Sequence, residues 1–173
     1  MAPYDAASPP PSISTSPVDF KEVLAHLASG VAIVSCWDGD TPRGLLVSSI
    51  TGLSVEPPRF LFCVRKEAAS HDALRAASEI GVALLGAADE EEALRFASAT
   101  HAAERFSPDR WRLSADAPPA YRAGLAAARC AIDSALDAGS HTIFVGRASH
   151  YTLAPGPPLV AWNRALFRGL SKS

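Results

Sequence analysis

Several features that mark other classes of protein are scarce in this chain. No apolar run approaches the roughly 20 residues of a membrane span. Basic and acidic residues number 16 and 18, and no basic stripe appears, so the electrostatic signature of a nucleic-acid-binding protein is missing. The first residues lack the charged start and apolar middle of a signal peptide, and we expect a cytoplasmic protein. The three cysteines are widely spaced in apolar runs, which predicts buried apolar side chains: Cys36, Cys63 and Cys130.

Sequence motifs of the common catalytic classes are also absent. We find no glycine fingerprint for dinucleotides, no phosphate loop, no His-Glu-x-x-His, no Cys-x-x-Cys and no Gly-x-Ser-x-Gly. The five histidines are scattered: His26, His71, His101, His141 and His150. A zinc site therefore has little support. We expect any chemistry to belong to a bound organic cofactor rather than to a side-chain nucleophile.

The N-terminal region divides into a tail and the start of a domain. Residues 1–17 are rich in Ala, Pro and Ser, which is typical of a disordered segment. Residues 18–170 are expected to form one domain. It begins with a helix that Asp19 caps, that Glu22 supports as a capping box, and that Gly30 ends.

The remaining pattern is mainly that of strands with inserted helices. Short hairpins link the strands, which favours an antiparallel barrel or sandwich over a doubly wound sheet. The acidic run 89–92 is interpreted as a solvated helix start that suits the helix dipole. Residues 99–119 are interpreted as an irregular segment and a candidate functional loop or lid. Predicted strands are 31–37, 44–51, 59–65, 79–85, 126–138, 141–153 and 159–162; predicted helices after the first are 71–77 and 89–97.

Hydroxyl side chains gather at the end of the second predicted strand, where Ser48, Ser49, Thr51 and Ser54 lie close in sequence. In a continuous strand, Ser49 and Thr51 would share one face. Such a group can hold a phosphate or the polar edge of a ring. An exposed, hydroxyl-rich strand end is the alternative, and this feature alone leaves both open.

Four stretches in order resemble the flavin reductase family, whose fold is an antiparallel split β-barrel that binds FMN or FAD. The resemblance covers roughly Phe20 to Leu170. It is carried by FKEVLAHLASGVAIVS, GLLVSSITGLSVEPPRFLFCV, AGSHTIFVGRASHY and PPLVAWNRALFRGL. Each stretch alone is weakly specific, whereas four in the right order and spacing are specific together.

The resemblance implies a set of site residues. His141 matches a hairpin histidine near the place where nicotinamide meets flavin, and is the candidate catalytic residue. Lys66, near a helix N-terminus, would suit the flavin phosphate. No metal ligand is implied. The implied cofactor-binding residues are Val47, Ser48, Ser49, Ile50, Thr51, Arg65, Lys66, Ser70, His71, Arg105 and Phe106.

The resemblance also implies an activity and partners. We expect an NAD(P)H:flavin oxidoreductase that reduces FMN, with FAD possible, using NADH or NADPH, and supplies a separate monooxygenase. A homodimer with flavin near the subunit interface is implied, with no nucleic-acid or membrane partner. Three alternatives stay open: a flavin-binding electron carrier, an oxidase or oxygenase acting on an organic substrate, and a fold relative that lacks reductase activity and acts as a binding subunit. The last is suggested because Ser48, Ile50 and Gly52 depart from the residues usual in the family.

Overall fold

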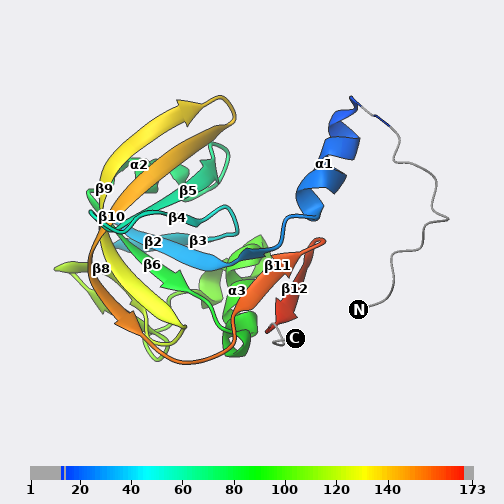
Figure 1. Cartoon of the computed structure of the whole chain (residues 1–173). Coiled ribbons are helices and arrows are strands. Elements are labelled where there is room, and N and C mark those ends of the chain that lie inside the picture. The colour runs from blue at the N-terminus through cyan, green and yellow to red at the C-terminus, as the bar shows by residue number, and fades with distance from the viewer. Residues whose placement is uncertain (1–12, 14, 170–173) are drawn as a thin grey trace.

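The computed structural model describes residue 13 and residues 15–169 (Figure 1). Most of the predicted tail, 1–17, and Leu170 at the end of the predicted domain therefore lie outside the described residues. Within the described part of the chain, no helix is both long and apolar enough to cross a membrane.

The first helix, α1, spans Pro17–Ala25. Its N-cap is Ser16, whose Oγ accepts a hydrogen bond from the Val18 amide at 3.2 Å, and Pro17 suits the first turn because its missing N–H would have no helical partner. The predictions that Asp19 caps the helix, with Glu22 as its capping-box partner, and that Gly30 ends it were therefore wrong. The chain leaves the helix at His26, and Gly30 belongs to a short strand, β1 (Ser29–Gly30).

A seven-stranded antiparallel sheet forms most of the molecule, which confirms a mainly β fold with inserted helices. Its strand order is β3-β2-β6-β9-β10-β5-β4. The longest pair, β9 and β10, forms the hairpin at the top of Figure 1. The strands are β2 (Ala32–Asp38), β3 (Thr41–Val47), β4 (Thr51–Ser54), β5 (Arg59–Arg65), β6 (Glu79–Leu84), β9 (Ala126–Ala138) and β10 (His141–Leu153).

The second predicted strand, 44–51, differs from the structure at both ends. Strand β3 begins at Thr41 and ends at Val47, and Thr51 opens a separate strand, β4. The hydroxyl of Ser49 donates to the carbonyl of Cys63 at 2.9 Å and accepts from its amide at 3.1 Å. A side chain thus takes the place of a ladder partner, as serine does where strands end. Ser49 and Thr51 consequently do not share the face of one strand.

The region 99–119, predicted as irregular, contains regular elements. The Trp37 indole Nε1 donates to the carbonyls of Ser114 at 3.1 Å and Ala117 at 2.8 Å. These bonds hold the hairpin that contains Ser114 and Ala117 on the sheet, so its position depends on tertiary contacts. The last strand was also missed. The remaining elements are α2 (His71–Ala76), η1 (Ala87–Asp89), α3 (Glu90–Ala97), η2 (Ala99–Glu104), β7 (Trp111–Ser114), β8 (Ala117–Tyr121), β11 (Leu159–Trp162) and β12 (Ala165–Arg168).

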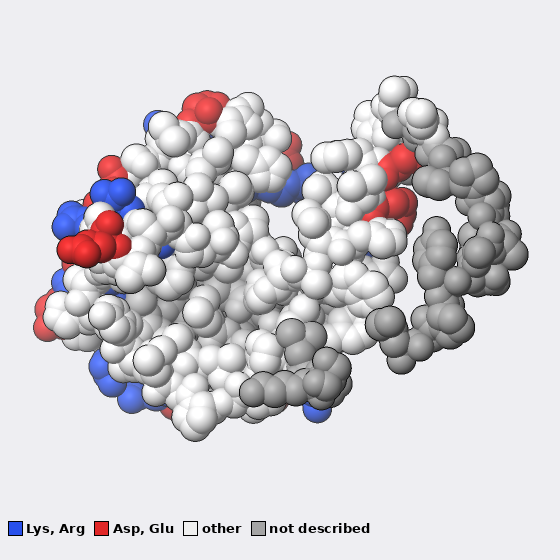
Figure 2. Space-filling model, in the orientation of Figure 1, with Lys and Arg blue, Asp and Glu red and all other residues white. Residues whose placement is uncertain are grey.

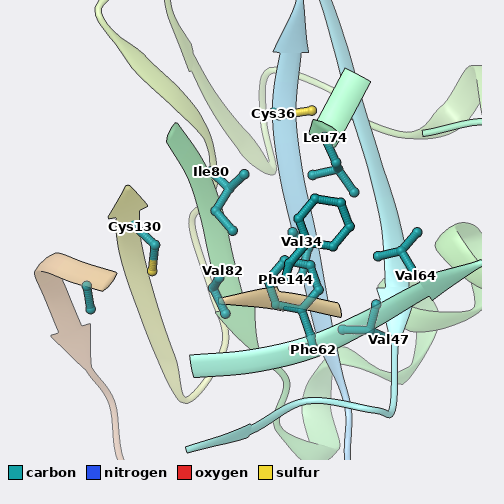
Figure 3. Packing of buried hydrophobic residues seen from close by; sticks show 12 residues of the cluster. Val34, Cys36, Val47, Phe62, Val64, Leu74, Ile80, Val82, Cys130 and Phe144 are labelled. Atoms are coloured by element: carbon teal, nitrogen blue, oxygen red, sulfur yellow. The ribbon is translucent and has the colours of Figure 1, made fainter. Parts of the chain in front are cut away.

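Two hydrophobic clusters lie on opposite faces of the sheet. The first fills the concave side, where Phe62 and Phe144 stack at 5.3 Å between ring centroids (Figure 3). Cys36 and Cys130 are buried in this cluster, as the sequence predicted, whereas Cys63 is half-buried. The second cluster includes Phe96, Phe106 and Trp111 and packs the α3 side against β2 and β3.

The acidic run at 89–92 starts helix α3 as predicted, and Glu91 is exposed, but two of its carboxylates are not solvated. The side chain of Glu92 is buried, with the residue 2% exposed, and accepts hydrogen bonds from Arg95, Arg110 and the Trp111 indole at 2.8–2.9 Å. Asp89 is also buried, and it binds the Gly86 amide and the Tyr121 hydroxyl. Both carboxylates satisfy donors in the interior.

Candidate functional site

The predicted site residues other than Arg105 and Phe106 come from four segments that meet at one rim of the sheet. These are the end of β3, the end of β5, the first turn of α2 and the start of β10. The contacts between Ser49 and Cys63 join the first two of them. A bond between His71 and Thr142, described below, joins the other two.

Residues 47–51 differ in what they present to solvent. Val47 is buried in the concave cluster, and Ile50 packs against its edge. The Ser49 hydroxyl is occupied by the backbone of Cys63. Ser48 and Thr51 are exposed, and no side-chain hydrogen bond of Ser48 is found within the described residues. Ser48 therefore offers a free hydroxyl at the strand end.

Two cations and a histidine lie next to one another across β5 and β10. Arg65 and His141 are directly paired in the strand register. The Arg65 side chain is exposed and forms no ion pair with the described residues. Lys66 follows it and contacts the Asp137 carboxylate at 2.5 Å, and this bond together with the Gly139 amide lowers the pKa of Asp137. His141 is partly exposed, and its Nδ1 lies 2.9 Å from the Ser140 hydroxyl.

Ser70 and His71 are turned inward. The Ser70 hydroxyl does not cap α2, but donates to the Gly44 carbonyl of β3 at 3.0 Å. His71 is only 6% exposed, with Nδ1 at 2.9 Å from the Asp72 carboxylate and Nε2 at 2.9 Å from the Thr142 hydroxyl. Both ring nitrogens thus already have protein partners.

Arg105 and Phe106 lie on the α3 side and also have internal contacts. The Arg105 guanidinium donates to the carbonyls of Arg95, Phe96 and Ser98 at the end of α3, and burial lowers its pKa. A methyl group at Gly44 would come within 2.9 Å of the Phe106 ring tip. Phe106 thus packs against Gly44, whose carbonyl accepts the hydrogen bond from Ser70. This contact joins the loop that contains Arg105 and Phe106 to β3.

Sequence reasoning missed two residues of the rim, Cys63 and Thr142. Cys63 takes part through its backbone, which binds the Ser49 hydroxyl, and the residue type of Cys63 does not indicate such a contact. Thr142 is 1% exposed and faces the interior of the sheet beside Phe144. Side chains along the predicted strand 141–153 point to alternate faces, so Thr142 lies on the same face as Phe144. The sequence could therefore have indicated that Thr142 is a buried polar residue that needs a hydrogen-bond partner.

The donor set of this rim fits an anionic cofactor with polar ring edges. Arg65 and Lys66 supply positive charge, Ser48 supplies a hydroxyl, and His141 supplies a polar ring at the neighbouring strand. Two hollows of the molecule lie elsewhere. One, of about 720 Å³, is bordered by β7, β8 and the far ends of β9 and β10. The other, of about 500 Å³, lies between the β4–β5 turn and those far ends.

Comparison with known proteins gives one consistent result. Residues 24–170 match the family described as "Flavin reductase like domain". An NADH-dependent FAD reductase of Streptomyces globisporus is 31% identical over 165 residues, covering 92% of this chain and 90% of the relative. The reductase component of a 4-nitrophenol monooxygenase from Rhodococcus opacus is 30% identical, covering 82% of this chain and 75% of the relative. The solved NADH:FAD oxidoreductase SgcE6 of Streptomyces globisporus C-1027 has a TM-score of 0.84 at 29% identity, covering 94% of this chain and all of that one.

Proposed function

Because the chain belongs to the flavin reductase like family, we propose that it reduces a flavin with NADH and delivers the reduced flavin to a separate monooxygenase. The relatives support NADH as the donor, and both FAD and FMN reductases occur among them. The observation that carries the proposal is the meeting of Arg65, His141 and the 47–51 segment at one rim.

The flavin supplies the hydride acceptor and the nicotinamide supplies the donor, so the protein has to bind and orient them. Ser48 and the backbone of 47–51 hold the polar edge of the flavin ring. Arg65, with Lys66 beside it, neutralises the phosphate. His141 orients the nicotinamide, because it is cross-strand from Arg65 and partly exposed.

Five of the predicted residues are proposed to support the binding surface without contacting the cofactor: Ser49, Ser70, His71, Arg105 and Phe106. Their polar groups or rings are engaged by the protein itself, so they shape the binding surface from behind. Holding ligand-binding groups rigidly in this way reduces the cost of ordering them when the cofactor binds.

The curled sheet is a split β-barrel in this interpretation. Edge strand β3 approaches β5, which lies near the opposite edge of the sheet. The bonds from Ser49 to Cys63 support this closure, since they join the segment after β3 to β5 without a ladder of backbone hydrogen bonds.

A homodimer completes the proposed site. Figure 2 shows α1 separated from the body by a gap, with few charged side chains on the surfaces that border it. The apolar residues of α1 are exposed, as is typical of a surface that a second subunit covers. The cytoplasmic location and the domain limits 18–170 remain predictions. The disordered tail over 1–17 also remains one, except at its end, where Ser16 caps α1 and Pro17 begins it.

The test is the consumption of NADH, followed by absorbance, with no flavin, with FAD and with FMN. Turnover that requires added flavin is expected, and the two rates rank the flavins. Tightly held flavin without turnover of added flavin would instead indicate an electron carrier. A folded protein that neither binds flavin nor oxidises NADH would contradict the proposal and favour a binding subunit.

A further inference from the structure

The first turn of α2 connects two strands that are far apart in the sheet. Ser70 binds the Gly44 carbonyl of β3, and His71 binds the Thr142 hydroxyl of β10. In the strand order, β2, β6 and β9 separate β3 from β10. No ladder therefore sets the distance between them directly, whereas the pair Ser70 and His71 spans it.

The bond between His71 and Thr142 has a defined direction. The Asp72 carboxylate can only accept at His71 Nδ1, so that nitrogen carries the proton in the neutral ring. Nε2 is then an acceptor, and the Thr142 hydroxyl donates to it. Because His71 and Thr142 are both buried, loss of either partner leaves a polar group unsatisfied in the interior.

Both anchored strands lead into the proposed site. Gly44 lies on β3, which ends at Val47 next to the free Ser48 hydroxyl. Thr142 is adjacent in sequence to His141, the residue proposed to orient the nicotinamide. A shift of β10 relative to β3 would thus change the distance between the flavin-binding and nicotinamide-binding groups.

We propose that His71 is a positioning residue for hydride transfer, which holds His141 at a fixed distance from the end of β3 through its bond to Thr142. This inference rests on the proposed flavin reductase function. It assigns His71 a role other than contact with the flavin phosphate, because neither ring nitrogen is left to bind one. Misplacement of reacting groups by about 1 Å can cost about a hundredfold in rate.

Thr142→Val tests this inference because it removes the hydroxyl and keeps the shape of the side chain. We expect kcat to fall about tenfold, while the Kd for FAD, from flavin fluorescence, changes less than about twofold. Thr142→Ser retains the hydroxyl and should restore kcat. The matched control is Ser35→Ala, which removes another buried hydroxyl, bound to the Pro119 carbonyl at 2.6 Å away from the rim. It should lower the melting temperature to a similar extent without lowering kcat.

Equal kcat values for Thr142→Val and Ser35→Ala would overturn the inference while leaving the flavin reductase function intact. A parallel rise in the Kd for FAD would also overturn it, since His71 would then support flavin binding itself. If Thr142→Val does not fold, Thr142→Ala provides the same comparison. A wild-type protein without flavin-dependent NADH oxidation would overturn the proposed function, and this inference with it.

Discussion

At the scale of single residues, the buried carboxylate of Glu92 holds together the loop that follows α3. It accepts from Arg95, Arg110 and Trp111, with its side chain almost fully enclosed. Glu92→Gln keeps the shape but removes the charge that strengthens these bonds. We expect a loss of about 2 kcal/mol in the free energy of unfolding, measured by urea denaturation of the flavin-free protein.

Glu91→Gln is the matched control for this prediction. Glu91 binds the same Arg95, but its side chain is 80% exposed. Exposed ion pairs contribute little, so we expect a change below about 0.5 kcal/mol. Equal losses for the two variants would show that the Glu92 network does not stabilise the loop.

The three thiols should differ in their reactivity. Burial raises the pKa of Cys36 to about 11 and that of Cys130 to about 12, so neither forms the reactive thiolate near neutral pH. Cys63 is half-buried. With a coloured disulfide reagent we expect one thiol to react in the folded wild type and all three to react after denaturation. In the folded Cys63→Ser variant we expect no thiol to react. Rapid reaction of a second thiol in the folded protein would contradict the burial of Cys36 and Cys130.

Residue types alone could predict that Cys36 and Cys130 are buried, because small apolar side chains in apolar runs usually face the core. The same reasoning predicted a buried Cys63, which the structure leaves half-buried. Residue types could not predict that Glu92 is buried. Its burial depends on Arg95, Arg110 and Trp111, and Trp111 reaches it only after the chain has turned through η2. The same holds for His71, whose partner lies 71 residues away in the sequence.

At the scale of elements, Asp133 of β9 links three strands and gives them a dependence on pH. Arg147 of β10 and Arg59 of β5 both bind it, and they lower its pKa below the ordinary value of 3.8. The unfolded chain therefore binds this proton more readily than the folded one. The stabilisation is fully present above the unfolded pKa and is lost as pH falls through the folded pKa.

Thermal melts of the wild type and Asp133→Asn between neutral pH and about pH 3 test this linkage. We expect a higher melting temperature for the wild type at neutral pH, and a difference that shrinks below about pH 4. Asp40→Asn serves as the control, since Asp40 is exposed and forms no ion pair with the described residues. A difference for Asp133→Asn that stays constant with pH would contradict the prediction.

For elements with strong local sequence signals, the predicted first and last residues agree with the structure. Strands β5, β9, β10 and β11 match because alternating or apolar runs and turn residues mark them. The predicted end of β3 was wrong because the Ser49 side chain binds the backbone of Cys63 in β5, and this contact cannot be seen in the local sequence. The hairpin of β7 and β8 was missed because Trp37 and Ser35 fix it from β2, and its own prolines indicate a loop.

At the scale of the whole molecule, α1 is the element that the second subunit of the proposed homodimer would cover. None of its residues is buried. It contacts the body through the Asn163 amide, which donates to the Ala25 carbonyl at 2.8 Å, and through the ion pair of Arg164 with Glu22. Phe20, Val23, Leu24 and Leu27 are each at least half exposed. Burying such a set in a dimer would contribute several kcal/mol, at about 25 cal/mol per Å² of apolar surface.

The variant Phe20→Glu/Leu24→Glu places two charges on this apolar face, one turn apart. Light scattering at micromolar concentration should give a dimer mass for the wild type and a monomer mass for the variant. The folded core should survive, because α1 contributes no buried side chain to it, and its near-ultraviolet circular dichroism should be retained. Lys21→Glu, on the same helix but outside the apolar set, should remain a dimer. A monomeric wild type would contradict the homodimer. A dimeric double variant would place the interface elsewhere, and the exposed face of α1 would then need another explanation.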